Sequence, residues 1–555
     1  MLLTGAQIVM ECLLEQGVDT VFGYPGGAVL NLYDALYEYR DRIRHIRTCH
    51  EQAAAHAADG YARASGRTGV CIATSGPGAT NLVTGIATAY MDSVPVVAIT
   101  GNVTRDLLGL DSFQEVDITG ITMPVTKHNY LVKHVERLAD TLRSAFRIAG
   151  SGRKGPVLVD IPKDITALKT EFTPRRPEPF PAADLPPDGQ LSRALAMLRS
   201  SKRPFFYCGG GVVSGGAARE AAEFAEKADA PVSCSLMCQG GYDQSGGRYL
   251  GMLGMHGTKA SAEAIKNCDL LVAAGTRFSD RVLCNAGLFA RHCKILQIDI
   301  DAAEFGKNID VDWKLQGDVK SILARLNGLL PQQDHAGWMK QAAGWKRDFP
   351  LRQAGGPDEV TPQAVLETLS RLTGGGAVLT TEVGQHQMWA AQYYTFRKPR
   401  HFITSGGLGT MGFGLGAAIG AKTAEPEETV VNCAGDGSFH MNCAELSTLA
   451  RYSIPVVELI FDNRTLGMVR QWQKLFYGGR FSQTDVDGNT DYAKLAGAFG
   501  VKALKIAKKH EIEPVLREAL SSRGPVLIDC LISKDENVLP MVPAGGSVED
   551  PILEM

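Results

Sequence analysis

The chain has 555 residues, of which 45% are hydrophobic and 21% are charged. Its 57 basic and 60 acidic side chains give a net charge of −3, which excludes the strongly basic surface that nucleic acid or an anionic membrane attracts. At roughly 100 to 200 residues per domain, this length predicts two to four domains with ample buried cores. The composition therefore favours small-molecule chemistry.

Several features predict a soluble cytoplasmic protein. Residues 1–18 read as the first helix of a domain, because Glu11 and Glu15 interrupt their apolar pattern and no basic segment of an export signal precedes it. The 12 cysteines are scattered, and Cys234 with Cys238 has no second pair at zinc-site spacing, so we expect buried, reduced thiols. The uncharged stretch 402–421 contains seven glycines, which favours close packing around a ligand over a membrane span.

The first third alternates expected strands with helices. A short strand at 46–49 leads to Glu51, which opens an alanine-rich helix, and a strand at 70–73 runs into a glycine turn at 75–78. The small side chains after Glu51 permit close packing around its carboxyl group. A glutamate in a first helical turn also stabilises the helix dipole, so the residues alone leave both interpretations open.

The middle third repeats this alternation between two expected connections. A proline-rich stretch at 173–187 precedes it and a polar stretch at 327–362 follows it, and both are expected to be exposed. Strands are expected at 203–208, 269–274 and 294–300, and the first two lead into glycines.

The last third contains the most specific pattern, the turn Gly435-Asp436-Gly437-Ser438. An apolar run at 429–434 predicts a buried strand before it, and residues 441–450 have helical periodicity after it. A helix N-terminus presents unpaired N–H groups to anions, so the turn can cradle phosphate. The alternative is a tight turn with an N-capping aspartate.

A spaced asparagine favours the first interpretation. Asn463 follows Gly437 after 25 residues (438 through 462), enough for one helix and a strand at 455–461. Asp436 and Asn463, with a backbone carbonyl such as that of Thr465, offer the hard oxygen ligands that Mg²⁺ prefers. Both would lie at the carboxyl ends of neighbouring parallel strands, which predicts a metal-bridged diphosphate cofactor.

An internal duplication sets the domain organisation. Three strand landmarks of the first third recur in order in the last third: Val70 with Val430 (offset 360), Pro95 with Pro455 (offset 360), and Gly155 with Gly524 (offset 369). The sequence therefore predicts an α/β protein of three doubly wound parallel-sheet domains. We expect domains at 1–165, 190–326 and 360–535, followed by a C-terminal tail at 536–555.

Specific motifs extend across almost the whole chain. The N-terminal domain contains VFGYPGGA (21–28), HEQ (50–52), SGPGATN (75–81) and FQE (113–115); the middle contains GMLGMHGT (251–258), TRF (276–278) and DID (299–301); the last contains VGQHQMW (383–389), GLGTMG (407–412) and DNRTLGMVRQW (462–472). With these motifs the chain resembles the large catalytic subunit of acetohydroxyacid synthases (acetolactate synthases), a family of thiamine-diphosphate-dependent enzymes.

The resemblance implies an activity. A member of this family decarboxylates pyruvate on thiamine diphosphate and transfers the hydroxyethyl carbanion to a second pyruvate or to 2-ketobutyrate, in the biosynthesis of branched-chain amino acids. The three domains would bind the pyrimidine, FAD, and the diphosphate with Mg²⁺, respectively. Because the reaction transfers no net electrons, the flavin would be structural.

The resemblance also implies roles for individual residues. The catalytic group would be Glu51, Gln114, Gly27 and Lys127, with Glu51 activating the pyrimidine ring of a cofactor shared across a dimer interface. Thiamine diphosphate would contact Pro25, Gly384, Gln385, His386, Gly409, Met411, Gly437 and Ser438, and Mg²⁺ would be held by Asp436, Asn463 and the Thr465 carbonyl. FAD would contact Gly209, Gly210, Gly211, Met255, His256, Gly275, Arg277, Asp299 and Asp318.

For the substrates, the resemblance implies Arg281, Trp472 and Phe113. A guanidinium fork suits the carboxylate of a 2-ketoacid, and an indole wall suits the extra methyl group of 2-ketobutyrate. Without the resemblance, Arg281 is equally a surface ion pair, and Trp472 and Met411 are equally core residues.

Expected partners are 2-ketoacids, a second copy or three further copies of the chain, and a small regulatory subunit. Nucleic acid and membranes are not expected. Two rival functions share this fold: a flavin-dependent pyruvate oxidase, and a noncatalytic scaffold that binds the cofactor. The match at Arg281 and Trp472 argues against the oxidase, and retention of Glu51, Asp436 and Asn463 argues against the scaffold.

Overall fold

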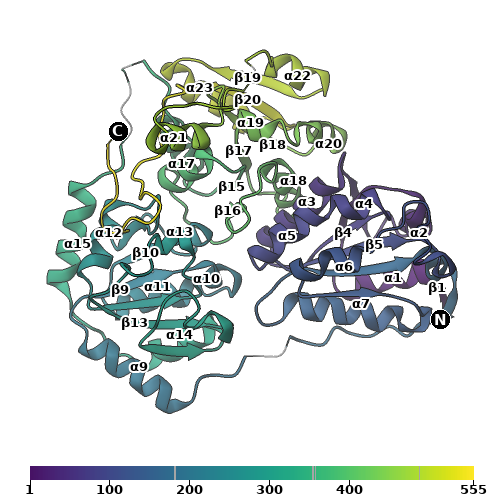
Figure 1. Cartoon of the computed structure of the whole chain (residues 1–555), viewed down its shortest axis with the longest axis horizontal. Coiled ribbons are helices and arrows are strands. Elements are labelled where there is room, and N and C mark those ends of the chain that lie inside the picture. Colours follow the sequence, from purple (N-terminus) through teal and green to yellow (C-terminus); the bar gives the residue numbers. More distant parts are fainter. Residues whose placement is uncertain (181–182, 353–355, 357, 487, 555) are drawn as a thin grey trace.

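In the computed structural model, which describes residues 1–555 except 181–182, 353–355, 357, 487 and 555, three six-stranded parallel sheets form three α/β domains. Figure 1 shows the N-terminal domain on one side, the middle domain below and opposite, and the C-terminal domain above both. The three-domain doubly wound architecture expected from the sequence is confirmed.

The N-terminal sheet has the order β3 (Arg44–Arg47), β2 (Thr20–Gly23), β4 (Gly69–Ala73), β5 (Val96–Asn102), β7 (Val157–Pro162) and β6 (His128–Leu131). Its helices are α1 (Gly5–Glu15), α2 (Leu30–Glu38), α3 (Glu51–Ser65), α4 (Pro77–Asn81), α5 (Val83–Met91), α6 (Ile118–Thr122), α7 (Val135–Gly150) and α8 (Lys163–Ala167), with 3-10 turns η1 (Gly27–Val29), η2 (Arg105–Leu107) and η3 (Met123–Val125). The chain does not begin in a helix: β1 (Leu2–Thr4) first pairs antiparallel with β8 (Lys169–Glu171), and Thr4 then caps α1.

The middle sheet has the order β11 (Tyr249–Met252), β10 (Val232–Cys234), β9 (Pro204–Cys208), β12 (Leu270–Ala274), β13 (Lys294–Asp299) and β14 (Trp313–Gln316). Its helices are α9 (Asp188–Ser200), α10 (Gly210–Ser214), α11 (Ala218–Lys227), α12 (Lys259–Asn267), α13 (Asp280–Leu283), α14 (Val319–Leu329) and α15 (Ala336–Asp348), with η4 (Leu236–Cys238) and η5 (Ala302–Glu304).

The C-terminal sheet has the order β16 (Phe402–Ile403), β15 (Val378–Thr381), β17 (Val430–Gly435), β18 (Val456–Asp462), β20 (Val526–Leu531) and β19 (Lys502–Ile506). Its helices are α16 (Pro362–Thr373), α17 (Gln385–Tyr393), α18 (Gly414–Ala424), α19 (Asp436–Phe439), α20 (Leu446–Tyr452), α21 (Gly467–Phe476), α22 (Tyr492–Ala498) and α23 (Ile512–Leu520), with η6 (Cys443–Glu445) and η7 (Lys509–Glu511).

The duplication expected from the sequence is confirmed by these strand orders. The three landmark pairs fall on β4 and β17, β5 and β18, and β7 and β20, which occupy the same ranks in their two sheets. Strands buried on both faces account for the continuous apolar runs from which they were predicted.

Two expectations about local structure were wrong. The helix expected at 441–450 is instead the 3-10 turn η6 followed by α20, and just before η6 the Asn442 side chain donates to the carbonyl oxygen of Gly412. The expected exposed connection at 327–362 contains α15, whose Trp338 is 4% exposed and donates its indole N–H to the carbonyl of Pro204 at 2.8 Å. Residues 353–355 and 357 of that connection lie outside the described residues.

The connection expected at 173–187 is exposed over residues 173–180, and residues 181–182 lie outside the described part. None of the helices in the described part of the chain is long and apolar enough to cross a bilayer.

The N-terminal and C-terminal domains share one hydrophobic core. Helix α3 packs directly on α18, as Figure 1 shows, and one apolar cluster contains buried side chains from both domains, including Phe22, Ile86, Phe413 and Leu415. The helices approach closely because glycines face backbone: a Cβ at Gly60 would lie 2.2 Å from the Ala417 carbonyl oxygen. The two domains of one chain are therefore held in a fixed relation.

Candidate active site

In each sheet the winding reverses direction between two neighbouring strands. These pairs are β2 with β4, β9 with β12, and β15 with β17. The loops at the carboxyl ends of such a pair diverge and leave a crevice in which open α/β sheets bind ligands. The glycine turns identified in the sequence follow these strands, so the topology places them at three crevices.

The C-terminal crevice is built around the imidazole of His386. Gly384, with φ +154°, caps α17, and a Cβ added there would lie 2.8 Å from the imidazole. A Cβ at Gly435, the last residue of β17, would lie 2.8 Å from Nδ1, so the ring lies between the two turns. Nε2 of His386 is buried without a hydrogen-bond partner. Burial lowers the pKa of His386 to about 3, which keeps the ring neutral at pH 7.

Asp436 provides a second unpartnered atom at this crevice. Its Oδ1 accepts the Gly437 N–H at 2.9 Å, while Oδ2 is buried with no partner. Burial, reinforced by the nearby carboxylate of Asp462, raises the pKa of Asp436 to about 7. A buried carboxylate beside a second one requires a counter-charge, which a divalent cation would supply. Ser438 is buried next to it and donates its hydroxyl to the Gly435 carbonyl at 3.1 Å.

Asn463 lies at the carboxyl end of β18, adjacent to β17, as the spacing predicted. Its Oδ1 accepts the Thr465 N–H at 3.1 Å, and its Nδ2 approaches Oε1 of Gln385 at 3.4 Å. Asp436, Asn463 and Thr465 are all at most 8% exposed. Among the described residues no cluster of three or more acidic, histidine or cysteine side chains could hold a metal. One carboxylate, one amide and main-chain oxygen instead suit Mg²⁺ that completes its shell with phosphate oxygens and water.

Gly409 and Met411 lie on an adjacent segment. Gly409 is exposed with φ +72°, and Met411 is partly exposed. We call residues 408–411 the ledge. Its far end is fixed by Glu382, whose carboxylate accepts the N–H of Gly412 at 2.5 Å and that of Leu415 at 3.2 Å.

Glu51 is the first residue of α3, as predicted. Its Oε2 accepts the Asn81 side-chain N–H at 2.9 Å, and a Cβ at Gly78 would be 3.3 Å from Oε1. Glu51 is only half-buried, so the close packing expected around its carboxyl group is not complete within this chain. No hydrogen bond or ion pair among the described residues joins Glu51 to Asp436 or Asn463.

The N-terminal crevice gathers further predicted residues. Pro25 and Gly27 follow β2, and the hydroxyl of Thr74, after β4, accepts the Ala28 N–H at 3.2 Å. Gln114, with φ +59°, folds over the turn after β4, where a Cβ at Gly76 would lie 2.9 Å from its carbonyl oxygen. The neighbouring Phe113 is 88% exposed.

Lys127 is not brought to this crevice. It precedes β6 and therefore lies at the opposite, amino edge of the same sheet, where its Nζ donates to the Ser151 carbonyl at 2.8 Å.

All residues expected to contact FAD lie at the carboxyl edge of the middle sheet. Gly209, Gly210 and Gly211 follow β9 and contact the turn at Gly275, after β12: the Gly211 N–H donates to the Gly275 carbonyl at 2.9 Å. His256 has a buried Nδ1 without a partner, and burial lowers its pKa to about 4. The remaining members of the set are Met255, Arg277 and Asp318, which follow β11, β12 and β14, and Asp299, which is the last residue of β13.

Two of the three expected substrate residues, Arg281 and Trp472, lie beside residues that bond to the C-terminal tail. Arg281, on α13, has a 63% exposed side chain with Nη1 at 3.6 Å from the Met255 sulfur. Trp472, on α21, is partly buried and packs edge-on against Phe476 at 5.4 Å. Main-chain groups of the tail bond to residues beside each of them: the Val542 N–H donates to the Met255 carbonyl, and the Val538 carbonyl accepts from Gln471.

Two residues at the site were missed in the sequence. Glu445, which is 1% exposed, accepts the N–H groups of Cys49 and His50 at 3.0 and 3.1 Å and so holds the turn before Glu51. Gln392, on α17, donates to the His256 carbonyl at 3.0 Å. Neither side chain stands in a motif, and both act across domains, so no local signal identified them.

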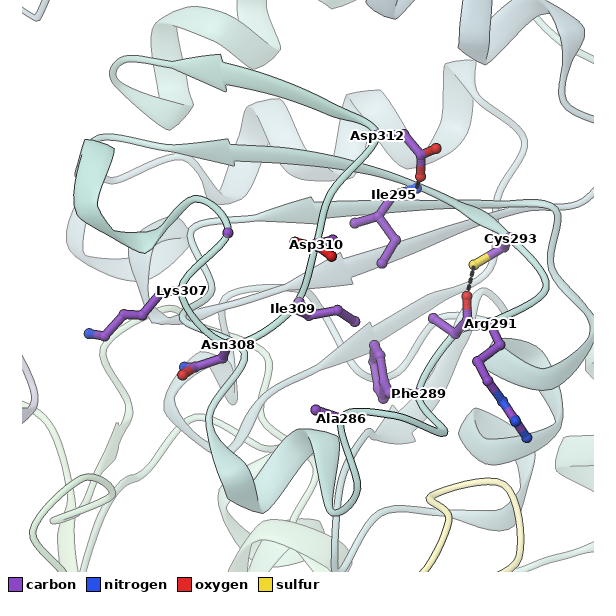
Figure 2. Close-up of a pocket in the computed structure, with 12 residues that line it drawn as sticks. Ala286, Phe289, Arg291, Cys293, Ile295, Lys307, Asn308, Ile309, Asp310 and Asp312 are labelled. Carbon is purple, nitrogen blue, oxygen red and sulfur yellow. Dashed lines mark hydrogen bonds between the residues drawn. The ribbon is translucent and has the colours of Figure 1, made fainter.

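A cavity of about 440 Å³ lies elsewhere, between residues 286–293, β13 and residues 306–312 of the middle domain. Figure 2 shows Phe289, Ile295 and Ile309 directed into it, while the side chains of Arg291 and Lys307 point away. It contains none of the predicted site residues.

Comparison with known proteins defines the class. Three family models match: the thiamine pyrophosphate enzyme N-terminal TPP binding domain at residues 3–121, the central domain at 191–326, and the C-terminal TPP binding domain at 382–530. Together with the crevice that Asp436 and His386 line, these matches define a thiamine pyrophosphate enzyme.

Two similar proteins identify the family within the thiamine pyrophosphate enzymes. The chain is 46% identical over 553 residues to the acetolactate synthase isozyme 2 large subunit of Escherichia coli (strain K12), covering 98% of both chains. It is 47% identical over 561 residues to a probable acetolactate synthase large subunit of Methanocaldococcus jannaschii, covering 98% of this chain and 94% of that one. The chain belongs to the acetolactate synthase large-subunit family.

Proposed function

We propose that this chain is the catalytic subunit of an acetolactate synthase, which joins two 2-ketoacids with loss of CO₂ in branched-chain amino acid biosynthesis. The donor is pyruvate, and the acceptor is a second pyruvate or 2-ketobutyrate. The products are 2-acetolactate and 2-aceto-2-hydroxybutyrate.

One observation carries the proposal: two buried, unpartnered polar atoms meet at the crevice between β15 and β17. Oδ2 of Asp436 suits a divalent cation, and Nε2 of His386 suits a phosphate oxygen, if this nitrogen carries the proton. Gly384, Gln385, Gly437 and Ser438 line the same crevice and complete a site for a Mg²⁺-bound diphosphate. Thiamine diphosphate, when bound, supplies the nucleophilic carbon on which such a decarboxylation depends.

Glu51 exchanges a proton with the pyrimidine ring of the cofactor, and the cofactor belongs to a second copy of the chain. Support comes from its half-buried carboxyl group and from the lack of a described contact to the metal site in its own chain. Phe113 at 88% exposure and the exposed Leu110 and Met123 lie on the same domain and suit burial against a partner. The working unit is therefore a homodimer or homotetramer, with Gly27 and Gln114 as further catalytic residues. Lys127 is left out of this set, because it lies at the opposite edge of the N-terminal sheet. Pro25, Gly409 and Met411 hold the pyrimidine and thiazolium rings.

The remaining assignments follow the family. At the carboxyl edge of the middle sheet, Gly209 to Gly211, Gly275 and His256 would hold FAD, whose role would be structural because the reaction transfers no net electrons. Arg281 binds the acceptor carboxylate, and Trp472 and Phe113 shape the acceptor pocket. A small regulatory subunit binds the assembly, which works in the cytoplasm. The domain limits 1–165, 190–326, 360–535 and the tail 536–555 are part of this proposal.

The bond changes balance without a redox partner. The bond between the carboxylate and carbonyl carbons of pyruvate breaks, CO₂ leaves, and the electron pair forms a new carbon–carbon bond to the carbonyl of the acceptor. That oxygen takes up a proton. A pyruvate oxidase would instead pass electrons through flavin to O₂ or a quinone.

The deciding experiment supplies pyruvate, thiamine diphosphate, Mg²⁺ and FAD to the purified chain. Product and oxygen are followed together. One acetolactate per CO₂ with no oxygen uptake supports the synthase, whereas oxygen uptake equal to CO₂ release identifies the oxidase, and no turnover with tight cofactor binding identifies a scaffold.

Replacing Glu51 with Gln tests its role. Turnover should fall by about 10²-fold or more, because a proton-transfer group is lost, while cofactor affinity is retained. Glu136→Gln is the matched control, since Glu136 also lies in a first helical turn, that of α7. Equal turnover in Glu51→Gln and wild type would remove Glu51 from the mechanism.

A further inference from the structure

A carboxylate of the N-terminal domain enters the C-terminal domain of the same chain beside the ledge. Asp92 caps the C-terminus of α5, and its side chain is 0% exposed. Its Oδ2 accepts the Gly406 N–H at 3.0 Å, and its Oδ1 accepts the Gly407 N–H at 2.7 Å. Both bonds hold main-chain groups immediately before the ledge.

Arg63 fixes this carboxylate. Its Nη2 donates to Oδ2 of Asp92 at 2.9 Å, and its Nε donates to Asp59 at 2.5 Å, one turn earlier on α3. Its Nη1 also reaches the carbonyl of Thr404 at 2.9 Å. A buried charge is tolerated when it is paired and hydrogen-bonded. Here the pairing joins three separate segments: α3, α5 and residues 404–407.

A second contact from α5 reaches the ledge itself. Thr88 lies one turn before Asp92 and therefore on the same face of the helix. Its hydroxyl is 2.7 Å from the hydroxyl of Thr410, and both residues are buried. The Thr410 N–H in turn donates to the Ser405 hydroxyl at 3.0 Å.

The ledge is thus held at both ends and exposed between them. Asp92 fixes residues 406–407 and Glu382 fixes Gly412, while Leu408 is 43% exposed and Gly409 adopts its left-handed φ. Figure 1 shows α3 next to α18, the helix that follows the ledge, and α5 packs on α3. A segment without regular structure, held by charged groups of another domain, has a position that depends on those groups.

We propose that Asp92, held by Arg63 and assisted by Thr88, is the positioning residue that sets the ledge of its own chain. The inference rests on the proposed function, in which Gly409 and Met411 hold the rings of the cofactor. Asp92 touches no reacting atom. It acts through the main chain of residues 406–407, so its removal displaces the ledge while the Asp436 site is unchanged.

The test compares Asp92→Asn with Asp269→Asn in the complete enzyme. Asparagine keeps the size of Asp92 but turns an N–H group toward the N–H groups of residues 406–407 and leaves Arg63 with one carboxylate. Asp269 is the matched control: its carboxylate accepts the N–H groups of Lys202 and Arg203 at 2.8 and 3.1 Å, in the middle domain.

Three quantities are measured. In Asp92→Asn, hydrogen–deuterium exchange of residues 404–412 should rise about tenfold, as the loss of one such bond implies. The kcat should fall by about 10- to 100-fold, because a misplacement of about 1 Å has effects of that size. The Kd of thiamine diphosphate with Mg²⁺ and the KM of pyruvate should stay within about threefold. Asp269→Asn should leave all three quantities unchanged.

Faster exchange with a reduced kcat and an unchanged Kd supports the proposal. Unchanged exchange, or faster exchange with wild-type kcat, overturns it. If Asp92→Asn does not fold, Gly407→Ala and Thr88→Val decide by the same criteria, since a Cβ at Gly407 would lie 2.9 Å from Oδ1 of Asp92. The exchange measurement does not require turnover. An inactive wild type would therefore reject the proposed function, while the exchange of residues 404–412 would still decide whether Asp92 holds the ledge.

Discussion

The contact between α3 and α18 makes a quantitative prediction for Gly420→Ala. Gly420 lies on α18, and a Cβ there would be 1.9 Å from the Ala57 carbonyl oxygen and 2.7 Å from the Tyr61 nitrogen, both on α3. Ordinary contact begins near 3.4 Å, so the helices would have to separate by about 1.5 Å (3.4 minus 1.9). Backbone atoms, unlike a flexible side chain, cannot rotate away.

The expected destabilisation follows from two opposing terms. Overpacking a close contact costs about 1–3 kcal/mol, and a clash with backbone lies at the upper end of that range. Alanine gains up to about 1 kcal/mol over glycine in a helix interior. The net loss is about 2 kcal/mol. For a domain of about 150–250 residues, a loss of this size lowers the thermal midpoint by about 4–8 °C.

Differential scanning calorimetry of the complete chain measures this change in the transition that contains the N-terminal and C-terminal domains. Gly497→Ala is the control, because Gly497 lies in α22 with no atom within 4 Å of an added Cβ. That variant should gain about 0.5–1 kcal/mol. An unchanged or raised midpoint for Gly420→Ala would refute the reasoning that close backbone packing joins the two domains.

Three further predictions concern the site. Asp436→Asn should weaken Mg²⁺ binding by at least about 100-fold, measured by calorimetric titration in the presence of thiamine diphosphate. Chelation of the metal should release the cofactor from the wild type. Wild-type affinity for Mg²⁺ in the variant would exclude Asp436 as a ligand. Burial raises the pKa of Glu382 to about 7, so its contribution to stability is present below pH 4.5 and is lost as pH rises to about 7. The wild type should lose about 3 kcal/mol of its free energy of unfolding in this way between pH 4.5 and 7, whereas Glu382→Gln should not. Denaturant titrations measure both free energies, and a difference between them that does not change with pH would contradict the raised pKa. Trp472→Leu should reduce the preference for 2-ketobutyrate over pyruvate by about tenfold in competition assays, and an unchanged product ratio would place Trp472 outside the acceptor pocket.

The sequence was most informative where function depends on short chain segments. The turn at Asp436 and the spacing to Asn463 predicted two residues that the fold places at the ends of neighbouring strands, because a strand, a turn and a helix fix the positions of their own residues. Periodicity and the offsets near 360 similarly predicted two sheets of like strand order. Glycines at 209–211 and 275 marked turns that contact each other in the middle domain.

What the sequence did not show depends on contacts between distant segments. The helix α15 was not predicted from the polar stretch 327–362, because its stability comes from packing Trp338 on the middle domain. Lys127 was assigned through the family resemblance, yet the direction of β6 places it at the edge opposite Gly27. Asp92 and Glu445 gave no local signal, since the main-chain N–H groups that they hold lie more than 300 residues away along the chain.

Local pattern thus determined the strands, the glycine turns and the kinds of side chain available for a metal and a diphosphate. Only the tertiary structure decided which turns face a crevice, which buried polar atoms are left without a partner, and which domain holds the ledge. The physical reason is the range of the interactions: hydrogen bonds within a turn or helix are set by neighbours a few residues apart, whereas burial and ion pairing arise only when α3 and α18 bring the first and last thirds into contact.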